Sequence, residues 1–287
     1  MIRLKRQIRE DDTLRKSFMD LALRTFNLSF ASWYRQGFWT DSYIPYVFEE
    51  DGRGVANVSA NRIHTVLDGV PRFYIQLGTV MTDPQYRHRG LASALIREVL
   101  QEWRSSCDGV YLYANQRVLD FYPRFGFERA VETQYTLPLA IDGGDYVRLD
   151  MEQEESRQLL LRRYQKSNPY SRLPMLDNWG LLMFYCGGPL KNCVYYSPSL
   201  DAVCIAAREQ DRIICYDLFC DSGLSMEEQL RILPFPGNHQ VILGFTPKNC
   251  KYCKQFPQSG EDPVFIWREK ENPFQGQDLM FPLLSHA

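Results

Sequence analysis

The most constraining feature of this chain is an uninterrupted strand, turn and helix that begins at Leu77. LGTVMT is typical of a strand, and DPQYRHRG, with Pro84 and Gly90, is typical of a turn. A helix is predicted from Gly90 to Trp103, because its apolar residues recur on one face. The strand-like segment GVYLYAN follows this crossover helix, so we expect it to pair parallel to the strand before the helix.

Antiparallel strands are predicted on the N-terminal side of this unit. The strand-like segments cover residues 43–50, 54–66 and 71–82. They are separated by EEDGRG and LDGV, in which Gly can adopt the positive φ of a tight turn. A short helix is expected over QRVLDFYPRF, and a last strand around 134–139 is expected to complete this sheet. An α+β fold with a mixed sheet is therefore predicted.

Two domains are expected from the length of 287 residues, at about 150 residues per domain. The Gly/Asp-rich segment at 141–145 is typical of a linker, which predicts domains 1–145 and 146–287. The second should be a smaller α+β unit with a helix over 151–166, and a degenerate copy of the first fold is an open alternative. We expect four successive strands there, LLMFYC, CVYYS, AVCIAAR and RIICYDLFC, followed by the helix SMEEQLRIL and the strand QVILGFT.

Charge and hydropathy exclude two classes of partner. The 33 basic and 35 acidic residues give a net charge of −2, and neither half is polybasic, which argues against nucleic acid. No apolar run approaches the roughly 20 residues that span a bilayer, and the N-terminus lacks the apolar core of a signal peptide. We therefore expect a cytoplasmic protein with no membrane partner.

The turn before the helix has the features of an anion site. Free N–H groups at a helix N-terminus attract phosphate or pyrophosphate, and Gly90 would let a phosphate approach the backbone. Three consecutive side chains, Arg87, His88 and Arg89, add positive potential. A plain helix start with solvated arginines is the alternative interpretation.

A second motif lies downstream, where Asn115 at a strand end is followed seven residues later by Tyr122 and then by Gly126-Phe127. With the Arg-x-x-Gly-x-Ala pattern of residues 87–92, it resembles the GNAT family of acyl-CoA-dependent N-acyltransferases. The resemblance covers roughly residues 1–140, in the order of elements as well as in both motifs.

The resemblance implies acetyl-CoA as co-substrate. The strand before the turn would splay from its parallel neighbour, and its main chain would bond the pantetheine arm through Val80, Met81 and Thr82. The pyrophosphate would be held by backbone N–H groups of Arg87, His88, Arg89, Gly90, Leu91 and Ala92. Asn115 would bond the pantetheine or help form the split.

The resemblance also implies a general acid but leaves the base open. Tyr122 would lie near the thioester sulfur, where the departing thiolate needs a proton; packing under the FGF turn is the alternative. Several family members carry a Glu where this chain has Gln76, which cannot accept a proton. The open alternatives are a water chain, a group from the second domain, an amine that arrives neutral, or one of Glu49, Glu50, Asp51 and His64.

Seven of the eight cysteines lie in the second half. We expect reduced, partly buried thiols and no metal site, because the Cys250-x-x-Cys253 pair lacks a second pair; His239 and Cys220 could join it only through folding. Cys107 is not expected to be a nucleophile. An aromatic cluster is expected either to pack in the core or to wall an acceptor pocket: Phe26, Phe30, Trp33, Tyr34, Phe38 and Trp39.

The expected activity is direct transfer of an acetyl group from acetyl-CoA to a primary amine of a small molecule or peptide. An acyl-CoA sensor or scaffold without turnover is the alternative, because Gln76 replaces the usual base. The second domain would shape the acceptor site or form a homodimer.

Overall fold

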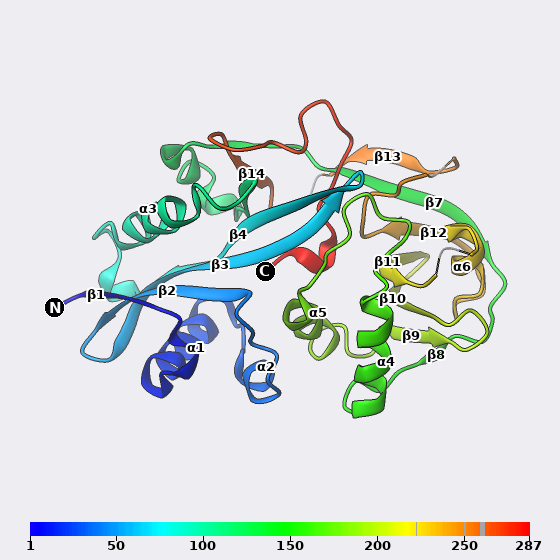
Figure 1. Cartoon of the computed structure of the whole chain (residues 1–287), viewed down its shortest axis with the longest axis horizontal. Coiled ribbons are helices and arrows are strands. Elements are labelled where there is room, and N and C mark those ends of the chain that lie inside the picture. The colour runs from blue at the N-terminus through cyan, green and yellow to red at the C-terminus, as the bar shows by residue number, and fades with distance from the viewer. Residues whose placement is uncertain (222, 250, 259–261) are drawn as a thin grey trace.

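A computed structural model describes residues 1–221, 223–249, 251–258 and 262–287. Their strands form two seven-stranded sheets that lie side by side (Figure 1). The first sheet has the order β1-β2-β3-β4-β5-β14-β6. Its strands are β1 (Arg3–Arg6), β2 (Tyr43–Glu50), β3 (Arg53–Leu67), β4 (Val70–Thr82), β5 (Gly109–Tyr113), β6 (Phe127–Arg129) and β14 (Val264–Trp267).

Helices cover both faces of the first sheet (Figure 1). Alternate residues of a strand point to opposite faces, so Tyr46 packs with helix α3 (Leu91–Trp103), whereas Val47 packs with α1 (Asp12–Phe26). The short helix α2 (Ala31–Arg35) lies on the α1 side.

The predicted hairpins and crossover are confirmed. Strands β2, β3 and β4 are successive antiparallel neighbours, and β5 returns after α3 to pair parallel to β4. The α+β fold with a mixed sheet is therefore as expected. The segment after β5 forms two short 3-10 turns, Gln116–Val118 and Tyr122–Phe125, where a short helix was predicted.

The second sheet has the order β13-β7-β12-β11-β10-β9-β8. Strands β11 and β12 run parallel, and the connection between them contains helix α6 (Met226–Arg231), which repeats the β4-α3-β5 arrangement. A degenerate second copy of the first fold stays a prediction. The strands are β7 (Thr133–Ile141), β8 (Val147–Arg148), β9 (Val194–Ser197), β10 (Ala202–Glu209), β11 (Arg212–Phe219), β12 (Gly237–Leu243) and β13 (Lys254–Pro257).

The two sheets exchange one strand each. β7 lies in the second sheet between β12 and β13, so the prediction that 134–139 completes the first sheet is wrong. That sheet is completed instead by β14, from the C-terminal part of the chain, between β5 and β6. The division at residue 145 stays a prediction about folding units.

One predicted strand is a helix. LLMFYC lies within α5 (Trp179–Cys186), whose first turn is capped by the Asn178 side chain, which accepts from the Leu181 N–H at 3.1 Å. A short apolar run does not separate a buried strand from a buried helix. The helix predicted over 151–166 is present as α4 (Glu154–Tyr164). Among the described residues, no helix is long and apolar enough to cross a membrane.

Candidate active site

The parallel strands β4 and β5 separate part-way along their length. Their pairing covers Tyr74–Leu77 and Gly109–Leu112, whereas β4 continues to Thr82. Just past the last pair, Thr79 has a φ of 48° and the register between β3 and β4 shifts. Val80, Met81 and Thr82 therefore lie on a stretch of β4 that has no β5 partner. The splay that the resemblance implied is present.

The turn after β4 leads into an uncapped helix. Gly90 is the N-cap of α3 with a φ of 75°, and no side chain caps the first turn. A Cβ at Gly90 would meet open space, so the glycine is required by its conformation rather than by crowding. Arg87, His88 and Arg89 are exposed around it. The first-turn N–H groups of Leu91 and Ala92 lie at the predicted anion site, and their pyrophosphate role stays a prediction.

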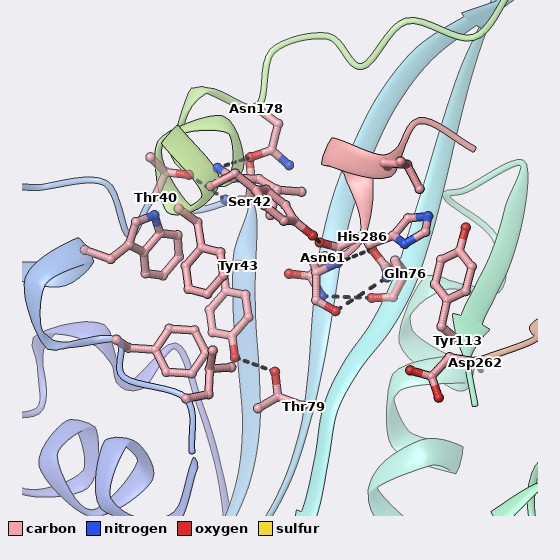
Figure 2. Close-up of a pocket in the computed structure, with 18 of the residues that line it drawn as sticks. Thr40, Ser42, Tyr43, Asn61, Gln76, Thr79, Tyr113, Asn178, Asp262 and His286 are labelled. Carbon is pink, nitrogen blue, oxygen red and sulfur yellow. Dashed lines mark hydrogen bonds between the residues drawn. The ribbon is translucent and has the colours of Figure 1, made fainter. Parts of the chain in front are cut away.

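A pocket of about 490 Å³ lies over the split (Figure 2). Its floor comes from Asn61 of β3, Gln76 and Thr79 of β4, and Tyr113 at the end of β5. Its walls come from the α2 region and from α5 of the second half. The aromatic side chains that line it are Phe30, Trp33, Tyr43, Tyr113, Phe184 and Tyr185.

The predicted aromatic cluster serves both as core and as wall. Phe30 and Trp33 line the pocket, and Trp39 stacks behind Trp33 at 5.8 Å between ring centroids. Tyr34 and Phe38 pack on the same core, whereas Phe26 is exposed. Core packing is thus confirmed for these buried members, and the role of Phe30 and Trp33 in an acceptor pocket stays a prediction.

The last residues of the chain reach the pocket floor. Leu283, His286 and Ala287 line it, and the Ala287 N–H donates to Gln76 Oε1 at 2.9 Å. The Gln76 amide also donates to the Ala287 carbonyl at 3.4 Å. Gln76 is therefore held in place as a hydrogen-bonding residue (Figure 2).

Tyr122 is buried next to the same sheet. Its ring packs near Phe127 and Phe265, with centroids at 6.3 and 6.2 Å. Burial raises the pKa of Tyr122 to about 12, so its phenol keeps its proton at neutral pH. It is not among the described residues that line the pocket, and its role as acid stays a prediction.

Asn115 lies directly after β5 and is exposed. Its side chain accepts from the Arg117 N–H at 3.0 Å and so caps the following turn. A direct bond to pantetheine stays a prediction.

None of the four side chains named as alternative bases lines the pocket. Glu49 accepts from the Gly52 N–H at 3.0 Å, and Glu50 accepts from the Tyr86 phenol at 2.8 Å. Asp51 belongs to the hairpin turn with a φ of 52°. His64 stacks on Phe73 with ring centroids 4.6 Å apart. The structure thus brings none of them to the predicted site.

Sequence reasoning missed a buried glutamate behind the pocket. The Tyr113 phenol donates to Glu132 Oε1 at 3.0 Å, and the ring of His286 lies 3.8 Å from that of Tyr113. Burial raises the pKa of Glu132 to about 7 and lowers that of His286 to about 3. A carboxyl that ionises near neutral pH beside a pocket is a candidate for proton transfer.

The cysteine prediction is partly wrong. Cys253 is disulfide-bonded, whereas the cysteines described as free thiols are Cys107, Cys186, Cys193, Cys204, Cys215 and Cys220. Cys250 lies outside the described residues. Within the described part of the chain, no group of three or more His, Cys, Asp or Glu could hold a metal ion.

Residues 11–130 match the acetyltransferase (GNAT) domain family. These residues are a GNAT domain. The match spans the split strands and both motifs. No curated protein matches the sequence.

Solved structures extend the likeness over nearly the whole GNAT-containing chain. A conserved protein of unknown function from Enterococcus faecalis V583, described as a probable N-acyltransferase, is 16% identical with a TM-score of 0.63, covering 93% of this chain and 72% of that one. A GCN5-related N-acetyltransferase from Kribbella flavida is 15% identical with a TM-score of 0.57, covering 93% and 71%. Eis1 from Mycobacterium abscessus is 16% identical with a TM-score of 0.56, covering 93% and 73%. At these identities the likeness shows the fold.

Proposed function

We propose that the protein transfers an acetyl group from acetyl-CoA directly to a primary amine in a ternary complex. The observation that carries this proposal is the coincidence of three features near the C-terminal ends of the central strands β4 and β5 of the first sheet. These are the split of β4 from β5, the uncapped N-terminus of α3 and the pocket over the split. One substrate could then lie in the split while the other occupies the pocket.

Acetyl-CoA fits the two features that belong to the GNAT domain. The pyrophosphate would bind the N–H groups at Gly90, Leu91 and Ala92, where the helix dipole favours negative charge. The pantetheine arm would bond the β4 main chain at Val80–Thr82 in place of the missing strand partner. Arg87 and Arg89 would screen the phosphates, and Asn115 would lie on the opposite side of the split.

The pocket suits an amine rather than an anionic acceptor. Asp262 is the one acidic side chain among the described lining residues, and none of them is Lys or Arg. The aromatic walls favour a cation through the negative faces of their rings. The carboxylate and these rings would attract a protonated amine, which must lose its proton before it attacks.

Tyr122 would donate a proton to the departing coenzyme A thiolate. Its buried phenol is protonated at neutral pH, as an acid must be before transfer. The packing of its ring by Phe127 and Phe265 would hold the phenol in one orientation.

The second candidate function is acyl-CoA sensing without turnover. It is favoured by Gln76, whose amide cannot act as a base and is engaged with residue 287. In that case the pocket would serve binding alone. A cytoplasmic location and assembly into a homodimer are further proposals that rest on the sequence.

The test is free-thiol release from acetyl-CoA with phenethylamine, spermidine, kanamycin and a lysine-containing tetrapeptide. Wild type should release thiol with at least one amine, and Tyr122→Phe should lower kcat by about 100-fold or more. Tyr196→Phe, at a phenol of the second sheet that donates to Asp201, is the matched control and should keep wild-type turnover. Coenzyme binding by wild type with no turnover of any amine would favour the sensor.

A further inference from the structure

Tyr113 lies at the point where the two strands separate. Leu112 is the last β5 residue paired with β4, so Tyr113 is the first residue beyond the pair. Side chains alternate along β5, which places Leu112 toward α3 and Tyr113 toward the pocket. The thioester of a substrate bound along β4 would therefore lie beside the Tyr113 ring.

Behind Tyr113 lies a carboxyl that is almost entirely buried. Glu132 is 5% exposed. Its Oε1 accepts one hydrogen bond from the Tyr113 phenol at 3.0 Å and another from the Phe281 N–H at 2.8 Å. Tyr113 is thus the link between this carboxyl and the pocket. A glutamate placed in the core without a cation needs such bonds, because burial of a charge is costly.

The titratable groups around this pair are phenols and one imidazole. Tyr111 lies on the same face of β5, Tyr185 of α5 lies near Tyr113, and the His286 ring packs against the Tyr113 ring at a tilt of 34°. No described Lys or Arg side chain contributes to the shift in the pKa of Glu132, which burial raises to about 7. The carboxyl therefore changes charge in the range where a general base is most effective.

We propose that Tyr113 and Glu132 form a proton relay that removes the proton from the attacking amine. Tyr113 is the catalytic residue, since it faces the pocket, and Glu132 is the positioning residue that orients its phenol and takes up the proton behind it. The inference rests on the proposed acetyl transfer and names the base that the sequence left open.

The neutral amine nitrogen forms a bond to the thioester carbon, and the carbonyl electron pair moves to oxygen. A proton then passes from the new ammonium to Tyr113 Oη while the Tyr113 hydroxyl proton passes to Glu132 Oε1. The oxyanion re-forms the carbonyl, the C–S bond breaks, and the thiolate takes a proton from Tyr122. Glu132 afterwards releases its proton to solvent, and Tyr122 regains one.

The other titratable groups of the pocket are less suited to this step. Burial lowers the pKa of His286 to about 3, so its imidazole is a weak base at neutral pH. Asp262 is exposed, and within the described residues no hydrogen bond joins it to Tyr113, whose phenol donates to Glu132. Tyr113 needs no phenolate in the relay, because it gains one proton as it gives up another.

The experiment measures kcat/KM against pH with the amine of the four-member panel that wild type uses best, at saturating acetyl-CoA. Wild type should show an acidic limb with a midpoint of about 7, in addition to the ionisation of the amine itself. The Glu132→Gln variant keeps a side-chain oxygen that can accept hydrogen bonds from the Tyr113 phenol and the Phe281 N–H. Its pH profile should lack the acidic limb, and its kcat should be about 100-fold below that of wild type, with the KM for acetyl-CoA unchanged. Glu132→Asp should restore part of both the limb and kcat.

Tyr113→Phe should give the same profile as Glu132→Gln, and the double variant should be no slower than either single one, because the two residues act as a unit. Tyr196→Phe removes a phenol of the second sheet that donates to Asp201 and does not line the pocket, and it should keep the acidic limb. If Glu132→Gln turns over the amine and its pH profile keeps the acidic limb, the relay is overturned while the proposed acetyl transfer stands. Absence of wild-type turnover with every amine would overturn the proposed acetyl transfer and the relay with it.

Discussion

Glu132 makes the stability of the folded chain depend on pH. Its pKa is about 7 in the folded state against a usual 4.5, and this difference corresponds to about 3 kcal/mol. Because folding favours the neutral carboxyl, its contribution is fully present below about pH 4.5. It is lost as the pH rises through 7, since the unfolded chain releases the proton first. We therefore expect the unfolding free energy of Glu132→Gln, relative to that of wild type, to rise by up to about 3 kcal/mol as the pH increases from about 4.5 through 7.

The assay is urea unfolding of wild type and Glu132→Gln at about pH 4.5, 6 and 8, with the difference in unfolding free energy plotted against pH. Glu128→Gln, at an exposed position on β6, is the matched control and should show a much smaller change. A difference that stays flat for Glu132→Gln would refute the reasoning, because it would mean that burial does not penalise the charged carboxyl.

Three further changes test individual parts of the account. Gly90→Ala should weaken acetyl-CoA binding in calorimetry and lower the unfolding free energy by about 1–2 kcal/mol, because φ is 75° at this position. Gly37→Ala is the control, since Gly37 has a φ of 77° and open space around it. It should lower the unfolding free energy by a similar amount and leave acetyl-CoA binding unchanged. Asn178→Ala removes the cap of α5 and a bond to the Arg62 carbonyl, and should lower the unfolding free energy by about 1–2 kcal/mol; an unchanged urea midpoint would contradict this. Asp262→Asn should raise the KM of cationic amines a few-fold, by about 1 kcal/mol or less at this exposed site, and an unchanged KM would exclude it from acceptor binding.

The parts of the fold that could be predicted are those encoded locally. The turn that ends at Gly90 and the helix to Trp103 follow from neighbouring residues, because a positive φ and an apolar stripe are short-range signals. The helix over Trp179–Cys186 was missed because it is apolar on every side. The exchange of β7 and β14 could not be predicted, since strand pairing across more than 100 residues leaves no local pattern.

The candidate site also has a part that could be predicted from the sequence and a part that could not. The proposed coenzyme-binding positions lie within a short stretch of the sequence and could be suggested from motifs. Glu132 could not, because its burial depends on Phe281, which is 149 residues away in sequence, and its link to the pocket depends on Tyr113. A single glutamate in the sequence is most often a solvated surface residue, and only the packing of the C-terminal segment over Glu132 shows that it is buried.

The most direct test of the central claim is mass spectrometry of the amine after incubation of wild type with acetyl-CoA, combined with initial rates over a grid of both substrate concentrations. Direct transfer in a ternary complex predicts an amine that gains one acetyl group for each thiol released, with intersecting double-reciprocal lines. Bound acetyl-CoA with no acetylated amine, or parallel lines that indicate an acyl-enzyme, would contradict the account.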